Sequence, residues 1–165
     1  MHKLLLLSTL ALTAFSATVP RPAPDFTIQN PGGRPQLLSA YKGKTIVLAF
    51  MYTTCTHCQK TAGELSAIQK EFADKGVQVV GVTFDVDAAK RVKSFNKVFG
   101  VTFPCGYSAE KPVLQVLQQP EGEPYFVPVL VFIDKNFVIR SQYIGDEQFL
   151  GNIPVNVRAE LAKIL

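Results

Sequence analysis

Two cysteines separated by two residues are the feature of this 165-residue chain with the clearest chemical meaning. Cys55 and Cys58 enclose Thr56 and His57, so the segment reads Cys-Thr-His-Cys. At the start of a helix, the first sulfur of such a pair lies near unpaired backbone N–H groups and the positive end of the helix dipole, which favour a thiolate. The second sulfur lies about one turn further on, within reach of a disulfide. We expect Cys55 to attack a partner disulfide and Cys58 to resolve the mixed disulfide.

His57 lies between the two cysteines and is a candidate for tuning their redox potential. Its imidazole can donate a hydrogen bond to the sulfur anion or, when protonated, pair with it. Either contact would stabilise the reduced form and make the disulfide more oxidising. The alternative is an exposed histidine at a helix start with no redox role.

The cysteine pair itself also has alternative interpretations. A structural disulfide is one, but a disulfide that closes so short a loop restricts the unfolded chain little. Half of a metal site is another, but no second pair of ligands accompanies Cys55 and Cys58. Two unrelated buried thiols are the third. We expect neither a metal nor a cofactor.

Composition excludes several other classes of protein. With 47% hydrophobic and 18% charged residues, the chain is globular rather than disordered, and its length suits one domain. Three cysteines are too few for a disulfide-stapled scaffold, and two histidines leave too few ligands for a zinc site. A net charge of +4 without a long run of Lys or Arg indicates neither nucleic acid nor an anionic membrane as a partner.

Residues 1–16 read as a secretory signal peptide, with a short basic start, an apolar stretch over Leu4–Phe15 and small residues after it. The apolar stretch is short for a membrane span. We expect cleavage after residue 16, with an uncleaved N-terminal anchor as the alternative. Residues 17–24 are Pro-rich and predict an extended linker. Residues 25–165 then form the domain, located in the periplasm or outside the cell and without stable membrane insertion.

Apolar periodicity places the cysteine pair between a strand and a helix. The continuous apolar run Thr45–Phe50 predicts a central strand, and apolar residues at helical spacing up to Phe72 predict a helix that ends at Lys75-Gly76. Asp25–Gln29 and the turn after it predict an N-terminal hairpin. Further elements are expected as strands over Val77–Phe84, Val101–Phe103, Val129–Ile133 and Phe137–Ile144, and as helices over Ala88–Phe99, Lys111–Gln118 and through Val157, Leu161 and Ile164.

This alternation predicts an α/β fold with a mixed central sheet and helices on both of its faces. Sites in such sheets lie beyond the carboxyl ends of the strands. Asp85 ends a predicted strand and, with Glu64 on the first helix, is a candidate proton acceptor. The alternatives are a strand-end cap for Asp85 and a solvated helix residue for Glu64. Cys105, which follows a short strand, is a candidate third redox thiol or a buried, inert one.

Pro128 begins a predicted strand in the segment Tyr125-Phe-Val-Pro128-Val. A proline at that position is compatible with an edge strand or with a cis turn. Together with the Cys-Thr-His-Cys segment, the cis peptide is the favoured interpretation.

In order and spacing these motifs resemble the thioredoxin superfamily, specifically the TlpA/ResA-like redoxins of its AhpC/TSA branch. The resemblance covers about Pro24 to Leu165 and rests on Ala23-Pro-Asp-Phe-Thr-Ile, Tyr41-Lys-Gly-Lys, Cys55-Thr-His-Cys58, Val79-Val-Gly-Val-Thr, Phe103-Pro104, Val127-Pro128 and Phe132-Ile-Asp134. It implies a thioredoxin-like fold with an N-terminal β-hairpin and an inserted αβ element, and an extracytoplasmic thiol–disulfide oxidoreductase.

The resemblance also implies partners and contacts. A cis proline at Pro128 would lie beside the cysteines, and the backbone of Val127 would hydrogen-bond a partner's cysteine segment, with Thr56 as a further substrate-binding residue. The partners would be thiols and disulfides of secreted proteins, with apocytochrome c as one such substrate, and a membrane thiol transporter as reductant. The protein is expected to be a monomer. The family leans towards reduction and His57 towards oxidation, so the direction stays open.

Several residues depart from the pattern of this family. Thr54 stands where a Trp is usual before the first cysteine, and Gly63 stands where a helix proline is usual. Thr61 replaces a frequent Glu, and Ala49 replaces the buried carboxylate that thioredoxins keep on the preceding strand. A familiar proton acceptor is therefore missing from the sequence.

Two other functions are weighed against disulfide exchange. A thiol peroxidase of the peroxiredoxin type needs a Pro-x-x-x-Thr/Ser-x-x-Cys pattern, but Leu48 and Tyr52 stand at its first two positions. A copper-binding chaperone of the Sco type is suggested by Phe50-x-Tyr52-Thr-x-Cys55, but it needs three residues between its cysteines and a later His, which the chain lacks. Two thiolates can still bind Cu(I) weakly.

Overall fold

A computed structural model of the chain describes residues 17–165. The predicted signal peptide, residues 1–16, lies outside this range. Within the described part, none of the helices is both long and apolar enough to cross a membrane.

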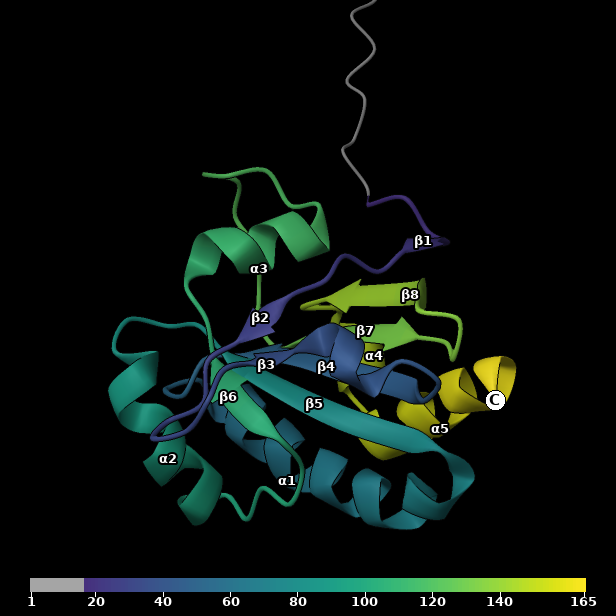
Figure 1. The fold of residues 1–165 in the computed structure, drawn as a ribbon, viewed down its shortest axis with the longest axis horizontal. Helices are drawn as coiled ribbons and strands as arrows, with labels where there is room; N and C mark the ends of the chain where they lie inside the picture. Colours follow the sequence, from purple (N-terminus) through teal and green to yellow (C-terminus); the bar gives the residue numbers. More distant parts are fainter. Residues whose placement is uncertain (1–16) are drawn as a thin grey trace, which may run out of the picture.

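A six-stranded mixed sheet forms the centre of the molecule (Figure 1). Its strands lie in the order β1 (Arg21–Pro22), β8 (Val138–Ile144), β7 (Val129–Ile133), β4 (Thr45–Met51), β5 (Val77–Thr83) and β6 (Cys105–Tyr107). Strands β4, β5 and β6 are parallel, whereas β7, β8 and β1 each run antiparallel to their neighbours. Strands β2 (Thr27–Ile28) and β3 (Gln36–Leu37) form a separate antiparallel hairpin. The predicted mixed sheet and N-terminal hairpin are confirmed.

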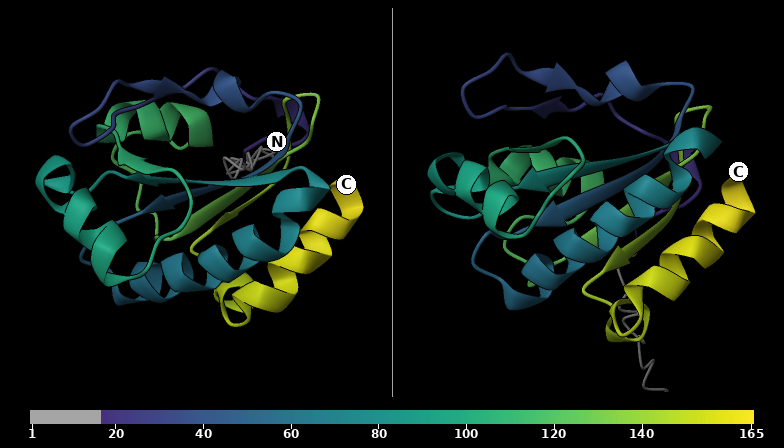
Figure 2. Two further views of the ribbon diagram at one scale, coloured as in Figure 1. Left: turned by 60° about the horizontal axis from the view of Figure 1, so that its bottom comes forward. Right: turned by 90° about the horizontal axis from the view of Figure 1, so that it is seen from below.

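Helices cover both faces of this sheet, as predicted (Figure 2). On one face lie α1 (Thr56–Phe72), α2 (Ala88–Val98), α4 (Glu147–Leu150) and α5 (Ile153–Ile164), and on the other lie α3 (Glu110–Leu117) and the hairpin with its 3-10 turn η1 (Leu38–Tyr41). A second 3-10 turn, η2 (Ala73–Lys75), ends α1. The helix α2 and the strand β6 lie between β5 and α3 in the chain and form the predicted αβ element.

The central strand β4 directs apolar side chains towards both faces of the sheet. This explains why its sequence is an unbroken run of apolar residues. Val47, Ala49 and Met51 pack on the side of α1, and the residues between them pack towards α3 and the hairpin. All of them are fully buried. Because β4 is covered on both sides, its carboxyl end is held rigidly where the cysteine segment begins.

The edge strand β6 differs from the sequence prediction. A strand was expected over Val101–Phe103, but this segment is a loop, and the strand begins at Cys105. Pro104 has no N–H for a sheet, and pairing with β5 starts at its carbonyl, which accepts from the N–H of Gly81 at 2.8 Å. Cys105 therefore starts a strand instead of following one.

The segment expected to be an extended linker, residues 17–24, is built into the sheet through Arg21 and Pro22. The guanidinium of Arg21 is buried and donates to the carbonyl oxygens of Thr18 and Val116 and to the side chain of Gln142. These contacts join the N-terminal segment to α3 and β8.

Candidate active site around Cys55 and Cys58

The cysteine pair lies at the start of α1, directly beyond the carboxyl end of β4, as the sequence predicts. Cys55 is the N-cap residue of α1 and has extended backbone angles. Its sulfur accepts a hydrogen bond from the backbone N–H of Cys58 at 3.3 Å. The sulfur thus takes the position of a capping oxygen, where N–H groups and the helix dipole stabilise negative charge. This arrangement equips Cys55 to act as the nucleophile.

Cys58 is the buried member of the pair. It is fully buried beside Ala49, Met51 and Ala62, in the core between β4 and α1. Burial, followed by the hydrogen bond with the Cys55 sulfur, raises the pKa of the Cys58 thiol well above its ordinary value, while the backbone N–H of Tyr52, 3.4 Å from the sulfur, acts in the opposite direction. The two thiols therefore differ in exposure, as an attacking and a resolving thiol should.

The Val127–Pro128 peptide is cis, as predicted, and it lies against the cysteine pair. The carbonyl oxygen of Val127 is 3.8 Å from the Cys55 sulfur. A groove of about 700 Å³ opens beside this contact and is lined by His57, Lys60, Phe126, Val127, Glu147 and Leu150, among others. The side chain of Phe126 is 72% exposed although it is a large apolar group, so the rim of this groove presents an accessible ring next to the reactive sulfur.

His57 lies on the exposed side of α1 and faces this groove. Within residues 17–165, no hydrogen bond joins its imidazole to either sulfur. The tuning role predicted for His57 would therefore act through the charge of the imidazolium on a neighbouring thiolate and not through a direct contact. It stays a prediction.

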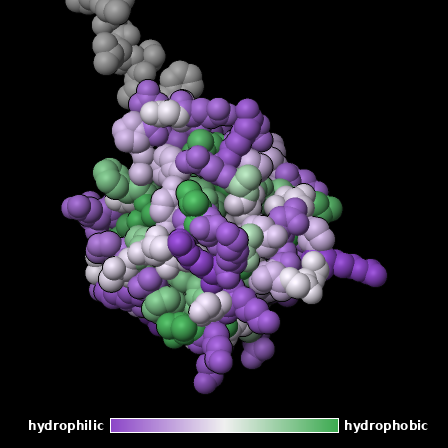
Figure 3. All heavy atoms as spheres, turned by 90° about the vertical axis from the view of Figure 1, so that its left-hand side faces the viewer, coloured by the Kyte–Doolittle hydropathy of each residue, from purple (hydrophilic) through white to green (hydrophobic). Residues whose placement is uncertain are grey.

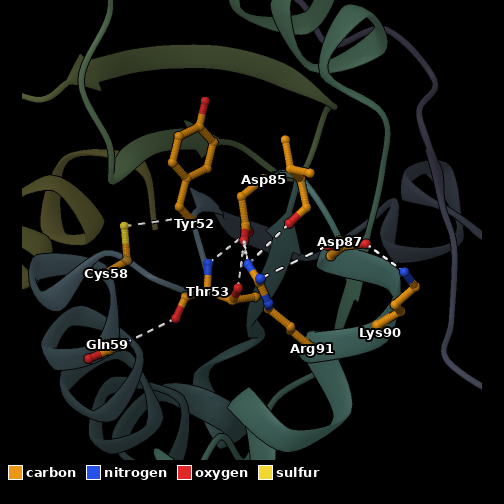
Figure 4. A network of polar contacts seen from close by, with 9 residues as sticks. Tyr52, Thr53, Cys58, Gln59, Asp85, Asp87, Lys90 and Arg91 are labelled. Atoms are coloured by element: carbon orange, nitrogen blue, oxygen red, sulfur yellow. Dashed lines mark hydrogen bonds and ion pairs between the residues drawn. The ribbon is translucent and has the colours of Figure 1, made fainter.

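The loop between β4 and α1 is held by Asp85 (Figure 4). One carboxylate oxygen of Asp85 accepts from the N–H of Thr53 at 2.7 Å, and the other accepts from its hydroxyl at 2.6 Å. Arg91 of α2 lies 3.6 Å from the same carboxylate. Asp85 thus lies at the active-site edge, as expected, with both oxygens engaged by Thr53.

Glu64 and Cys105 are the two remaining candidates. Glu64 is on α1, half-buried, and pairs with Lys60 at 3.7 Å. Cys105 lies in the core opposite Gly81, so close that a Cβ added at Gly81 would be 2.7 Å from its sulfur. Burial raises the pKa of the Cys105 thiol to about 12. These surroundings favour the inert thiol over the third redox thiol, which stays a prediction without support from the geometry.

Sequence reasoning missed a chain of hydroxyl contacts next to the site. The hydroxyls of Tyr52 and Tyr125 are 2.7 Å apart, and that of Tyr125 also donates to the carboxylate of Glu110. The ring of Phe84 packs against both tyrosines. Tyr52 directly follows β4 and Phe84 directly follows β5, so their closeness could have been predicted from the sequence. No sequence pattern placed Tyr125 or Glu110 beside them.

Figure 3 shows the end of the molecule towards which β4 and β5 run, where the loop to α1 begins. On this face apolar side chains form small groups separated by polar ones. Among residues 17–165, no cluster of three or more His, Cys, Asp or Glu side chains is arranged to hold a metal ion.

Known proteins of similar sequence are named as thioredoxin-like proteins or as thiol-disulfide oxidoreductases. The thioredoxin-like protein YneN of Bacillus subtilis (strain 168) is 29% identical over 129 residues, which cover 74% of this chain and 69% of that protein. The thiol-disulfide oxidoreductase ResA of Geobacillus thermodenitrificans (strain NG80-2) is 28% identical over 150 residues, covering 86% and 83%.

Solved structures agree in fold. A thiol:disulfide interchange protein of the thioredoxin family from Chlorobium tepidum TLS superposes with a TM-score of 0.69 at 21% identity, over 87% of this chain and 98% of that one. A thiol:disulfide interchange protein from Bacteroides sp. reaches 0.65 at 21% identity, over 83% and 92%. The fold is thus thioredoxin-like. A family model for AhpC/TSA matches residues 19–142, which include the sheet from β1 into β8 and the cysteine pair, and the chain therefore belongs to the AhpC/TSA family.

Proposed function

We propose that this protein is a thiol–disulfide oxidoreductase that acts outside the cytoplasm on cysteines of secreted proteins. The observation that carries the proposal is the geometry of the pair: a half-buried Cys55 whose sulfur caps α1, and a fully buried Cys58 whose N–H reaches that sulfur at 3.3 Å. The names of YneN and ResA support the same chemistry.

In the reductive direction, the reaction has two exchange steps. The thiolate of Cys55 attacks a substrate disulfide, forms a mixed disulfide and releases one substrate sulfur, which takes a proton. Cys58 then loses its proton and attacks the sulfur of Cys55. The second substrate thiol leaves, the Cys55–Cys58 disulfide remains, and two electrons have passed to the substrate. Oxidation of a substrate runs through the same steps in reverse.

Substrates are proposed to bind at the groove beside Cys55. The backbone of Val127, next to cis Pro128, lies within 3.8 Å of the sulfur and offers a carbonyl to an extended peptide, with Thr56 at the helix start as a further contact. The exposed ring of Phe126 gives the rim of the groove an apolar surface for the side chains that flank a substrate cysteine.

The location and the electron donor are proposed from the sequence. The predicted signal peptide points to an oxidising compartment, in which a dithiol must be reduced again after each turnover. By resemblance to TlpA/ResA-like redoxins, a membrane thiol transporter would supply these electrons and apocytochrome c is one substrate. The protein is proposed to act as a monomer.

The test is insulin reduction by the purified protein with dithiothreitol as electron source. We expect Cys55→Ser to abolish turnover. Cys58→Ser should retain a single attack and accumulate a mixed disulfide, visible by mass spectrometry. Cys105→Ser is the control, because its thiol is buried away from the groove, and it should turn over like the unsubstituted protein. Full activity of Cys55→Ser would refute the mechanism, and loss of activity in Cys105→Ser would restore the third-thiol hypothesis.

Two further assays of the same purified protein distinguish disulfide exchange from the two other functions considered in the sequence analysis. Consumption of hydrogen peroxide with a sulfenic acid on Cys55 would favour a thiol peroxidase. The hydroxyl of Tyr52, at the position where a peroxidase needs a donor, is instead paired with Tyr125. Retention of Cu(I) without disulfide turnover would favour a copper-binding chaperone.

A further inference from the structure

Asp85 and Thr53 meet because of the register of two parallel strands. Met51 of β4 is paired with Thr83 of β5, and Thr53 and Asp85 each come two residues later. The side chain of Asp85 is only 7% exposed. A buried carboxylate needs hydrogen-bond donors, and Thr53 supplies two of them.

These two hydrogen bonds fix a short stretch of backbone that contacts the Cys58 sulfur and the first turn of α1. The N–H of Tyr52, one residue before Thr53, donates to the Cys58 sulfur at 3.4 Å. The carbonyl of Thr53 accepts from the side-chain amide of Gln59 at 3.0 Å, in the first turn of α1. Holding Thr53 therefore holds the donor to Cys58 and the start of the helix together (Figure 4).

Resting on the proposed exchange function, we propose that Asp85 is a positioning residue that keeps the Tyr52 N–H directed at the Cys58 sulfur while Cys58 resolves the mixed disulfide. In that step a bond forms between the sulfurs of Cys58 and Cys55 and the bond from Cys55 to the substrate breaks. The Cys58 thiol first gives its proton to water, and the substrate sulfur leaves as a thiolate and takes a proton from water. The N–H of Tyr52 stabilises the Cys58 thiolate that makes the attack.

Positioning and proton acceptance by Asp85 make opposite predictions for one substitution. An asparagine can still accept from the N–H of Thr53 and can donate to its hydroxyl, but it cannot take a proton. Asp85→Asn should therefore work if Asp85 acts by geometry, and it should fail if Asp85 acts as the proton acceptor. The facing groups are Arg91, 3.6 Å away, and Asp87, which pairs with Lys90 and Arg91.

The experiment follows stopped-flow reaction of the reduced protein with dithionitrobenzoate, an aromatic disulfide that releases a coloured thiolate in each of the two steps. We expect Asp85→Ala to leave the first release near the unsubstituted rate and to slow the second about tenfold, the loss expected for one hydrogen bond to a charged sulfur. Asp85→Asn should stay within about threefold, well under the tenfold that one such bond is worth. The matched control is Asp87→Asn, which removes a carboxylate from the same ion-pair cluster without touching Thr53, and it should leave both rates unchanged.

Several outcomes would overturn the inference. An Asp85→Asn protein as slow as Asp85→Ala would assign the effect to the charge or to proton transfer. Equal second-step rates in all variants would remove Asp85 from the reaction. If Asp85→Ala fails to fold, Thr53→Val against Thr53→Ser makes the same comparison, with the slower second release expected only in the valine variant. Failure of the exchange function is distinct, because the unsubstituted protein would then release no coloured thiolate.

The pH profile separates positioning from a general loss of stability. The backbone N–H of Tyr52 lowers the pKa of Cys58 against the larger effect of burial. The charge of the Asp85 carboxylate acts with burial and raises this pKa, and both substitutions remove it. Asp85→Asn, which keeps the Tyr52 N–H in place, should therefore move the midpoint of the second step to lower pH. Asp85→Ala also loses the direction of that N–H, so its midpoint should lie at higher pH than that of Asp85→Asn. A uniform fall in rate at every pH would indicate a structural role only and would contradict the proposal.

Discussion

At the level of single residues, the two sulfurs owe their different roles to their surroundings and not to their chemistry. Cys55 is half-buried at a helix start, and Cys58 is fully buried against β4. The buried Ala49 and Thr61 bring no carboxylate to the surroundings of Cys58, which lies in an apolar core cluster. This explains why burial is the largest cause of its raised pKa.

Replacing His57 tests whether a residue without a direct contact tunes the pair. His57→Gln should lower the reduction potential by about 10–20 mV, the equivalent of an exposed charge pair of under 1 kcal/mol. Glutathione redox titration measures this. Lys60→Gln, which removes a charge from the same groove one turn further on, is the control, and an equal shift in both variants would make the effect non-specific.

At the level of elements, three segments meet through the hydroxyl of Tyr125: the loop after β4, the approach to β7 and the start of α3. Burial and the Glu110 carboxylate raise the pKa of Tyr125, so the hydroxyl stays protonated and donates. Tyr125→Phe keeps the ring against Phe84 but loses both hydroxyl contacts. We expect a loss of about 1 kcal/mol in stability and a looser segment before Pro128.

The kinetic consequence of Tyr125→Phe should appear in substrate binding. KM for insulin should rise while the rate with dithionitrobenzoate, which needs little of the groove, stays near normal. Tyr107→Phe is a suitable control because Tyr107 lies in β6, outside this chain of hydroxyls. An unchanged KM for insulin would show that the segment before Pro128 is held by its rings alone.

Most elements could be predicted from the sequence because their apolar periodicity is set by the cores they face. Both faces of β4 are buried, and its run is accordingly continuous. Strand β1 could not be predicted, since Arg21 and Pro22 carry no strand pattern and are held by tertiary contacts of a guanidinium. The start of β6 after Pro104 is set by the pairing of the Pro104 carbonyl with Gly81 of β5, which the local sequence does not reveal. Tyr125 and Tyr52 are distant in the sequence, and only the folded chain brings their hydroxyls together.

For the whole molecule, the dependence of stability on pH offers a test at the β7–β8 turn. Asp134 is buried, which by itself opposes ionisation, but donors from Arg140 and from the backbone of Val138 and Asn136 outweigh this and lower its pKa. A carboxylate whose folded pKa is lowered contributes stability above its unfolded pKa of about 4, and this contribution is lost as the pH falls through the folded value.

Asp134→Asn should therefore cost about 1–2 kcal/mol at pH 7, the worth of a charge-assisted hydrogen bond, and should flatten the decline in stability below about pH 4. Urea unfolding at a series of pH values measures both effects. Asp74→Asn in the exposed η2 turn is the matched control and should leave the curve unchanged. If Asp134→Asn lost the same free energy at pH 3 as at pH 7, the turn would be stabilised by the shape of the side chain alone, and the ionised carboxylate would have no part in holding the two strands together.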